Sequence, residues 1–345
     1  MTDSSLAAVV DKPQTQTVLA GLQDEGIHDD TRHIEEYDDG RVAIPVTAPP
    51  QQTAVREVIQ LVGEPRLRTL ADHLRDRGWT DDEIKRAPSS WAVIGSVVLV
   101  DVGNSPRPGE MGDALLAMHA HADTVLAREG IAGEHREPAV EVIAGVGDTR
   151  TVHREHGTVY ALDLAEVMFS PGTQAERARM GEIVDDGERV LDMFAGIGYF
   201  TLPMARNGAR VTAVERNPVA FEYLVENVLR NEVQTRVETY RADCRNVVSG
   251  GLEAADDSSP FAFDRVVMGY YEAHEYLESA LAAVTSGGTI HMHEATPEGR
   301  VPERPVSRLE EAATARGRTV DVEATRTVKG YSEGVVHVVV DAVVL

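Results

Sequence analysis

Three acidic residues stand directly after strand-like segments in the second half of the sequence, and one of them precedes a pair of glycines. Asp192 ends an apolar stretch and is followed by Gly196 and Gly198. Glycines in such a turn let a ligand approach the backbone without meeting a Cβ atom. A carboxylate before the turn would repel a dinucleotide's pyrophosphate, and Thr201 replaces the third glycine of the dinucleotide-binding pattern. The spacing therefore favours a cationic adenosine ligand without phosphates: S-adenosylmethionine, whose ammonium a carboxylate can face.

The other two acids complete this expected cofactor site. Glu215 ends the next strand, about 20 residues beyond Gly196, where an acid can accept hydrogen bonds from both ribose hydroxyls. Asp243 ends the third strand and can accept from the adenine amino group, while the backbone of Cys244 can meet a ring nitrogen. Any one of these acids would as readily cap a helix or face solvent. Because all three follow successive strands, we expect them to meet in one crevice at the carboxyl edge of a parallel sheet.

A histidine-rich strand carries the remaining candidate groups. His291 and His293 share one face of this strand, and Glu294 lies on the other. Two histidines without an evident third ligand do not predict a metal site, so we expect no metal. Structural histidines and histidines that contact a substrate both fit this pattern.

The elements that position these residues alternate regularly from Arg189 onward. Strand-like runs at RVLDMF, ARVTAVE, RVETYRA, DRVVMGY and GTIHMHE are separated mostly by helical runs, and GVVHVVVDAVVL forms a final strand. The helix after Glu215 is the clearest, with Asn217 as its cap and Pro218 in its first turn. This alternation predicts an α/β fold with a doubly wound, mostly parallel, Rossmann-like sheet.

The first half of the chain is less regular. Pro49 and Pro50 indicate a linker, residues 54–78 look helical, and a strand is expected at 91–103. We expect three parts: a short N-terminal module at 1–50, a middle α/β domain at 51–172 and a cofactor-binding catalytic domain at 173–345.

The composition is strongly acidic and poor in lysine. Of 345 residues, 33 are basic and 57 acidic, which gives a net charge of −24, and the only lysines are Lys12, Lys85 and Lys329. Because the acids are spread along the chain, they indicate salt adaptation of the kind found in halophilic archaea; an acidic protein that binds basic partners is the alternative. Molar salt shortens the Debye length to about 3 Å, so this charge does not exclude an RNA substrate. With one cysteine, no secretory signal and no membrane-length apolar run, we expect a cytoplasmic protein.

Two segments, VMFSPGTQAERARM at 167–180 and VLDMFAGIGYFTLPMA at 190–205, resemble the family of archaeal tRNA methyltransferases and wybutosine-synthesis enzymes. The likeness covers roughly residues 18–345. It implies a class I methyltransferase-like Rossmann fold, preceded by a smaller α/β domain and a short N-terminal tRNA-binding module. It also implies that the first segment clamps the cofactor, so we expect Ser170 and Arg177 to hold the methionine tail, since arginine suits bidentate carboxylate binding. Alternatively, Arg177 is a surface residue paired with an acid.

Members of this family perform two chemistries on the nucleotide immediately 3′ of the anticodon. One branch methylates N1 of guanosine. The other transfers the 3-amino-3-carboxypropyl group of S-adenosylmethionine to C7 of 4-demethylwyosine in tRNA(Phe) and releases 5′-methylthioadenosine. Methylating members typically carry an Asn-x-Pro motif after the fourth strand, where this sequence has Gly269 and Tyr270. With IHMHE in the fifth strand, this resembles the aminocarboxypropyl branch, which we predict; tRNA (guanine-N1)-methyltransferase is the alternative.

On this prediction the acceptor base is itself the nucleophile, and a protein group must take its C7 proton. His291, His293 and Glu294 are the candidate catalytic bases. Gly269 and Tyr270 are the expected substrate-binding residues, with Tyr270 or the tyrosine after it stacking on the unpaired base. Either tyrosine fits a packing role equally well.

The expected ligands and partners follow from the same prediction. They are S-adenosylmethionine as co-substrate and tRNA(Phe), with no membrane and a monomeric protein. A tRNA-binding protein that holds the cofactor without catalysis is the alternative of a different class. A dehydrogenase is disfavoured by Asp192 and Thr201.

Overall fold

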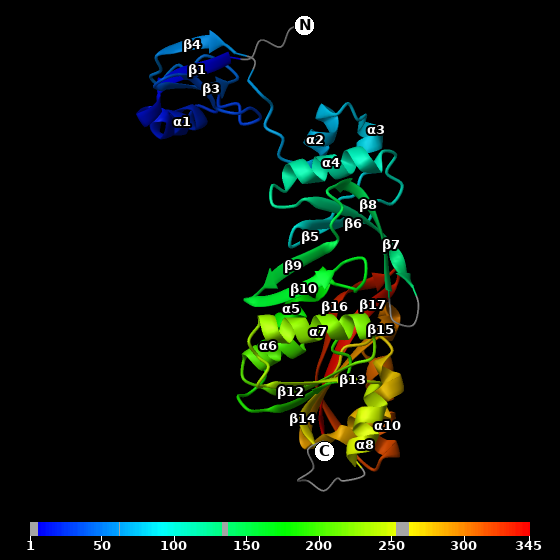
Figure 1. Ribbon diagram of the computed structural model, residues 1–345. Coiled ribbons are helices and arrows are strands. Elements are labelled where there is room, and N and C mark those ends of the chain that lie inside the picture. Colours follow the sequence, from blue (N-terminus) through cyan, green and yellow to red (C-terminus); the bar gives the residue numbers. More distant parts are fainter. Residues whose placement is uncertain (1–5, 62, 133–136, 253–261) are drawn as a thin grey trace. The chain divides into compact units, whose positions relative to one another are not determined.

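The structure is a computed structural model that describes residues 6–61, 63–132, 137–252 and 262–345 (Figure 1). The chain divides into two compact units, Met1–Lys85 and Arg86–Leu345. Each unit has a sheet and an apolar core of its own.

The first unit is built on a small antiparallel sheet. Its elements are β1 (Leu6–Asp11), α1 (Thr15–Asp24), β2 (Glu35–Asp38), β3 (Arg41–Val46), β4 (Glu57–Gln60), α2 (Leu70–Asp76) and α3 (Asp81–Ile84). The sheet order is β2-β3-β1-β4, and apolar residues of β1 and β3 pack against Val18 and Leu22 of α1. β4 pairs with β1 within the segment 54–78, so the helical prediction for that segment is wrong except at α2. The sheet therefore continues beyond residue 50, the expected end of the first module.

The second unit begins with a four-stranded sheet in the order β5-β6-β7-β8. Its elements and those of the following hairpin are β5 (Trp91–Ile94), β6 (Val97–Val100), α4 (Pro108–Met118), β7 (Thr124–Ala132), β8 (Glu137–Gly145), β9 (Arg150–Glu155) and β10 (Thr158–Asp163). The strand expected at 91–103 is in fact two antiparallel strands, because the chain turns at Gly95 and Ser96.

A seven-stranded sheet in the order β13-β12-β11-β14-β15-β17-β16 completes the second unit. Its elements are α5 (Gln174–Glu182), β11 (Arg189–Asp192), α6 (Thr201–Arg206), β12 (Arg210–Glu215), α7 (Pro218–Arg230), β13 (Val237–Arg241), α8 (Cys244–Leu252), β14 (Phe263–Met268), α9 (Leu277–Ala283), β15 (Val284–Pro297), α10 (Glu303–Ala315), β16 (Val320–Ser332) and β17 (Val335–Val344). The five strands from β13 to β15 are parallel, and β17 runs antiparallel to both neighbours. The predicted doubly wound, Rossmann-like fold is confirmed. The predicted final strand, β17, is inserted between β15 and β16.

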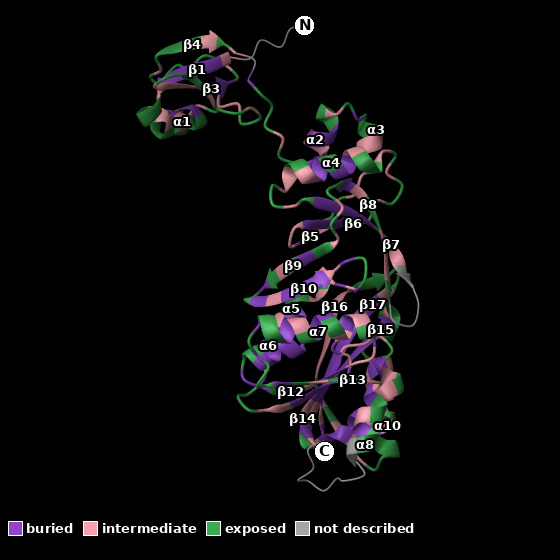
Figure 2. Cartoon of the chain, in the orientation of Figure 1, coloured by how far each residue is buried: buried purple, intermediate pink, exposed green. Residues whose placement is uncertain are grey.

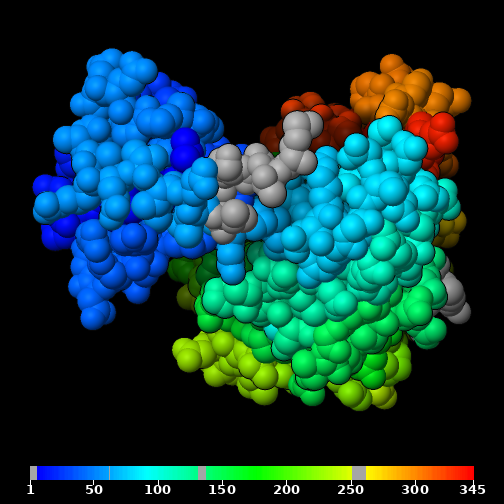
Figure 3. Space-filling view, turned by 90° about the horizontal axis from the view of Figure 1, so that it is seen from above, coloured from blue at the N-terminus to red at the C-terminus, as the bar shows by residue number. Residues whose placement is uncertain are grey.

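Helices cover both faces of this sheet because its strands are apolar on both sides. Val190 packs in a core with α5, α6 and α7, whereas its neighbour Leu191 packs with α8, α9 and α10. Adjacent strand residues point to opposite faces, and each fully buried side chain of this size contributes about 1.5–3 kcal/mol. Figure 2 shows the buried strands beneath helices with exposed outer faces. In the space-filling view of Figure 3, segments coloured cyan and green form much of the visible surface.

A buried amide joins α7 to β10 and to the turn after β11. Asn227 accepts a hydrogen bond from the Ala161 N–H (2.7 Å) and donates to the carbonyls of Ala161 (3.0 Å) and Ile197 (3.0 Å). One turn later, Asn231 makes the equivalent pair of bonds to the backbone of Val159 (2.9 and 2.7 Å). Since Ile197 lies between the two glycines, Asn227 fixes the glycine turn to the sheet's helical cover.

Candidate active site

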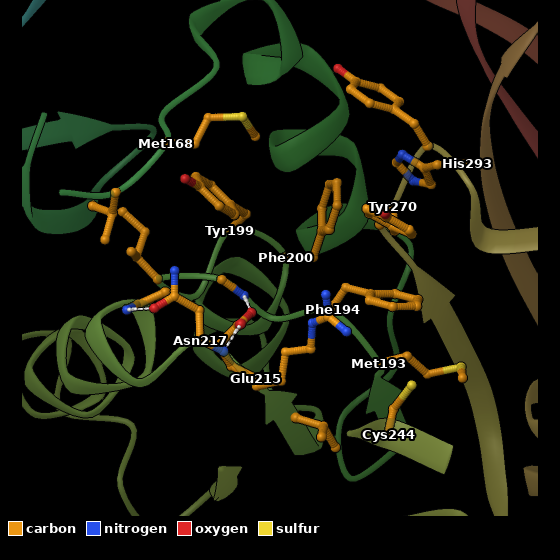
Figure 4. Close-up of a pocket in the computed structure, with 18 of the residues that line it drawn as sticks. Met168, Met193, Phe194, Tyr199, Phe200, Glu215, Asn217, Cys244, Tyr270 and His293 are labelled. Carbon is orange, nitrogen blue, oxygen red and sulfur yellow. Dashed lines mark hydrogen bonds between the residues drawn. The ribbon is translucent and has the colours of Figure 1, made fainter. Parts of the chain in front are cut away.

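A cavity opens at the carboxyl edge of the parallel sheet, over the ends of β11, β12 and β14 (Figure 4). It measures about 1200 Å³, counted out to its open mouth. The predicted site residues that line it are Ser170, Gly196, Glu215, Asp243, Cys244, Gly269, Tyr270 and His293. The predicted site residues outside its lining are Arg177, Asp192, Gly198, His291 and Glu294.

The glycine turn has a backbone that excludes larger residues. Gly196 has a φ of 56° and Gly198 a φ of 103°, both in the region that L side chains rarely adopt. A Cβ on Gly196 would lie 2.5 Å from the ring of Tyr199, and one on Gly198 would lie 2.7 Å from Cγ of Leu202. Gly196 therefore borders the ligand space, while Gly198 allows α6 to pack closely.

Asp192 lies beneath this turn and is completely buried. Its carboxylate accepts hydrogen bonds from the Thr201 hydroxyl (2.7 Å) and from the Phe194 N–H (3.3 Å). Burial raises the pKa of Asp192 to about 6. The carboxylate turns toward Thr201 and is not part of the cavity lining, so Asp192 positions the turn and does not face the ligand space as we expected.

Glu215, at the end of β12, is held by the same turn. Its carboxylate accepts from the N–H groups of Gly196 (2.8 Å) and Asn217 (2.7 Å). Burial raises the pKa of Glu215, and the two backbone donors oppose that rise. Each carboxylate oxygen keeps another lone pair, which leaves it able to accept from the two hydroxyls of a ribose. Asn217 also caps α7, as predicted, by accepting from the N–H groups of Val219 and Ala220.

Asp243 and Cys244 follow β13 at the same edge. The Asp243 carboxylate is fixed by Arg245, through its backbone N–H (2.9 Å) and its guanidinium (2.6 Å), and these bonds lower the pKa of Asp243. Burial, aided by the charge of Asp243, raises the pKa of the Cys244 thiol to about 12. The thiol is therefore protonated near neutral pH and is not a nucleophile.

An aromatic wall stands beside these acids. The rings of Phe194 and Tyr270 stack with centroids 5.2 Å apart, and Tyr276 meets Phe194 edge-on at 4.9 Å. Gly269 precedes this wall, and a Cβ there would lie 2.8 Å from the ring of Phe200. Such a wall suits the flat face of a nucleobase.

A pair of buried histidines lies at another part of the cavity. Figure 4 shows His293 beside Phe200 and away from Glu215 and Cys244. Its Nδ1 is 2.9 Å from Nε2 of His337, and its own Nε2 is buried without a hydrogen-bond partner among the described residues. Burial and the neighbouring His337 lower the pKa of His293 well below its usual value, so the ring is neutral at pH 7. Our sequence reasoning missed His337, although a histidine within the apolar run VVHVVV was a visible signal.

His291 precedes His293 by two residues in β15 and lies outside the cavity lining. Its Nδ1 is 2.6 Å from the Asp341 carboxylate, and its Nε2 meets Arg265. Arg179 and Arg326 also pair with Asp341, which completes a buried network and holds the pKa of Asp341 very low. Both ring nitrogens of His291 are engaged inside the protein. The structure therefore supports a structural role for His291 in place of the expected catalytic one.

Glu294 points to the opposite face of the sheet from His293. It is fully buried and pairs with Arg304 (3.2 Å) and Arg308 (2.9 Å) of α10, while the Thr296 hydroxyl donates to it at 2.9 Å. The alternation of side chains along a strand places it there. Glu294 is therefore not placed to act as a catalytic base, contrary to our expectation.

Arg177 is neither on the surface nor in the cavity lining. It is 2% exposed, and two of its nitrogens each lie 2.8 Å from a Glu155 oxygen. Its third nitrogen donates to the Ser170 carbonyl (2.9 Å) and to the Thr173 hydroxyl (2.6 Å). Arg177 therefore holds the turn that presents Ser170 to the cavity. Its expected contact with the methionine tail is not supported by its position, and the alternative is right about a pairing with an acid but wrong about a surface position.

Two features are absent from the part of the chain that the structure describes. Within the residues that the structure describes, no three His, Cys, Asp or Glu side chains gather into a metal-binding group. Over the same residues, no helix has the length and apolar character needed to cross a membrane.

Comparison with known proteins gives two family matches that together span most of the second unit. Residues 151–323 match the TRM5/TYW2 methyltransferase domain, and residues 70–149 match the TYW2 N-terminal domain. The chain is 35% identical over 281 residues to the tRNA(Phe) (4-demethylwyosine(37)-C(7)) aminocarboxypropyltransferase of Pyrococcus horikoshii, a match that covers 81% of this chain and 96% of that protein.

Solved structures resemble the chain over long spans. The P. horikoshii TYW2 structure in complex with MeSAdo has a TM-score of 0.65 and 32% identity, and covers 79% of this chain and 97% of that one. Wild-type Trm5b from Pyrococcus abyssi has a TM-score of 0.75 and 30% identity, and covers 99% of both chains.

Proposed function

Because the chain belongs to the TRM5/TYW2 methyltransferase family, we propose that it is the aminocarboxypropyl-transferring member of that family. It transfers the 3-amino-3-carboxypropyl group of S-adenosylmethionine to C7 of 4-demethylwyosine at position 37 of tRNA(Phe) and releases 5′-methylthioadenosine. The observation that carries this proposal is the 35% identity over 96% of the P. horikoshii aminocarboxypropyltransferase.

The cavity has the parts that this reaction needs. Glu215 is placed to accept from the ribose, Asp243 from the adenine amino group, and Gly196 lets the ligand approach the backbone. The sulfonium makes a neutral thioether a good leaving group at any of its three carbons. The protein must therefore choose which carbon faces the acceptor, so catalysis depends mainly on positioning.

His293 is the protein group that we assign to the acceptor proton. C7 attacks the γ-carbon, the γ-carbon–sulfur bond breaks with its electron pair going to sulfur, and the C7 proton passes to Nε2 of His293. The ring is neutral, lines the cavity and has no hydrogen-bond partner at that nitrogen among the described residues. Tyr270 is the proposed stacking partner of the acceptor base, with Gly269 leaving room beside it.

The alternative is tRNA (guanine-N1)-methyltransferase. The full-length likeness to P. abyssi Trm5b favours it. Gly269 and Tyr270 stand against this alternative, because the methylating branch typically carries an Asn-x-Pro motif at this place.

Labelled cofactor separates the two activities. We expect label in the methionine carboxyl to enter tRNA(Phe) that carries 4-demethylwyosine, with release of methylthioadenosine. Incorporation of methyl label alone, with release of S-adenosylhomocysteine, would assign the chain to the methylating branch. Cofactor binding without either product would assign it a non-catalytic role.

The remaining assignments belong to the same proposal. We assign tRNA binding to the N-terminal module, with its boundary moved from residue 50 to beyond β4 because β4 belongs to the same sheet, a connecting α/β role to the middle part that ends at 172, and catalysis to 173–345. We further propose that the protein acts as a monomer in the cytoplasm, and its acidic, lysine-poor composition supports a halophilic archaeal source.

A further inference from the structure

The transferred group differs from a methyl group in carrying a carboxylate, which a cation within its reach can bind. Arg216 lines the cofactor cavity beside Glu215, and Lys329 lines a neighbouring cavity. Arg177 was the expected partner, but its guanidinium is engaged with Glu155 and with the turn at Ser170. Ser170 itself lines the cavity. The cation that reaches its hydroxyl is Lys329 of β16, whose Nζ lies 2.5 Å from Oγ of Ser170.

Strand pairing places Lys329 beside the cofactor cavity. In the register of β16 and β17 it is the direct neighbour of His337, which lines the cofactor cavity. Its stem lies against Gly172, where an added Cβ would come within 3.0 Å of Cδ of Lys329. The close fit between this stem and the Ser170–Thr173 turn fixes the direction of the ammonium group.

A second cavity adjoins the first along this wall. It is lined by Lys329 and, among others, by Trp91, Arg128 and Tyr331, and it shares Val167, Met168, Ser170 and Tyr271 with the cofactor cavity. Ser170 thus borders both spaces, with the ammonium of Lys329 at its hydroxyl. A carboxylate bound at this point would lie away from the adenosine end of the cofactor cavity, on the side that faces the second cavity.

We propose that Ser170 and Lys329 form a binding subsite for the α-carboxylate of the group that is transferred. This rests on the proposed function and adds the device that selects the γ-carbon over the methyl group. An ammonium has three donors, so Lys329 can bond to Ser170 and to a carboxylate oxygen together. With adenosine held at Glu215 and Asp243 and the carboxylate held here, the chain between them presents its γ-carbon, not the sulfonium methyl, to the acceptor.

The other two lysines lack this setting. Lys12 and Lys85 are on the surface and pair with Glu36 (2.7 Å) and Asp82 (2.9 Å). Lys85→Gln therefore removes the same charge from the chain without touching either cavity.

The test compares two ligands on the full chain. S-adenosylmethionine has the carboxylate, and methylthioadenosine lacks the whole tail. In Lys329→Gln we expect S-adenosylmethionine to bind about 10- to 100-fold more weakly, which is the loss of a charged hydrogen bond, while methylthioadenosine affinity changes less than about twofold. Lys329→Arg should recover part of the loss, and Lys85→Gln should leave both affinities unchanged.

Product analysis of the same variants provides the second readout. With substrate tRNA, Lys329→Gln should release less methylthioadenosine and a larger share of S-adenosylhomocysteine than wild type. Equal weakening of both ligands would overturn the proposal in favour of a packing role for the lysine, and unchanged S-adenosylmethionine affinity would overturn it outright. If wild type releases only S-adenosylhomocysteine, the proposed function fails, while the difference between the two affinities still decides whether the carboxylate binds at Lys329.

Discussion

At the residue scale, burial shifts the pKa of three groups in or beside the cavity. The His293 ring is neutral because its pKa is lowered, the Cys244 thiol is protonated because its pKa is raised to about 12, and Asp192 titrates near pH 6. Only the imidazole of these three is a free base at neutral pH that also lines the cavity. We assign the acceptor proton to it because it lines the cavity and its Nε2 has no hydrogen-bond partner among the described residues. Its lowered pKa makes it a weak base, which suffices because the alkylated acceptor is cationic until it loses the C7 proton.

Replacing His293 by Asn should separate catalysis from binding. We expect the single-turnover rate of aminocarboxypropyl transfer to fall about 100-fold or more, since a positioned base contributes at least that much. Cofactor affinity should stay within about twofold of wild type, because the adenosine contacts lie elsewhere. The matched control is His291→Asn, which should lower the melting temperature through the Asp341 network without a comparable loss of rate. An unchanged rate in the His293 variant would remove it from the mechanism.

Asp192 should give the protein a measurable pH dependence of stability. Its pKa is about 6 in the folded protein and about 3.8 when unfolded, so the unfolded state releases this proton first. The associated stability is fully present below about pH 4 and is lost as pH rises through about 6, with a total near 3 kcal/mol. The difference in unfolding free energy between wild type and Asp192→Asn, measured by urea at pH 4 and pH 8, should change by this order. A difference that is independent of pH would mean that the carboxyl titrates normally.

At the scale of elements, the site depends on how strands and helices hold the glycine turn. The turn is fixed from below by Asp192, from the side by Glu215 and from the helical layer by Asn227. The strand that leads into the turn and two elements further along the chain, β12 and α7, thus define one small backbone segment. A substitution in any of these elements should therefore alter the glycine turn and, through it, the affinity for the ligand.

The buried amide of Asn227 offers the clearest test of this coupling. Asn227→Ala leaves the backbone groups of Ala161 and Ile197 without partners, so we expect a loss of about 3–5 kcal/mol in unfolding free energy and a weaker affinity for S-adenosylmethionine. Asn231→Ala is the control, since it also frees β10 backbone groups but makes no bond to the turn. Its cofactor affinity should stay close to that of wild type. Equal losses of affinity in both variants would show that general destabilisation is the cause.

The sequence predicted the parallel core of the sheet and the acids at its edge, because strand ends in this topology must meet. It could not predict that Asp192 turns away from the cavity, since that depends on the hydroxyl of Thr201 across the turn. Nor could it place His337 and Lys329, because both come from β16 and β17, whose pairing beside β15 is a long-range event. Local patterns therefore identified most residues that line the cavity, including His293, whereas the neighbours contributed by β16 and β17 depend on distant pairing.

At the scale of the whole molecule, the net charge of −24 should control stability more than any single pair. Salt screens the mutual repulsion of the acids, so we expect the melting temperature to rise by about 10 °C between 0.1 and 2 M KCl. Thermal unfolding followed by circular dichroism measures this. A melting temperature that does not respond to salt would favour the alternative, an acidic surface kept for a basic partner.

The first sheet ends with β4, before residue 70, so tRNA binding by this part should be separable from cofactor binding. A variant that begins at residue 70, where the family match begins, should bind S-adenosylmethionine as tightly as the full chain but bind tRNA at least about tenfold more weakly. Calorimetry for the cofactor and filter binding for tRNA at the same salt concentration measure the two affinities. Equal tRNA affinity in both forms would contradict an RNA-binding role for the N-terminal module.

The bare backbone at Gly269 limits which residue can occupy this position. A Cβ there would lie 2.8 Å from the Phe200 ring, which stands at the start of α6, so a larger residue requires that ring to move. Residues 200 and 269 are therefore coupled, and an exchange of the glycine should be tolerated best together with a smaller side chain at residue 200.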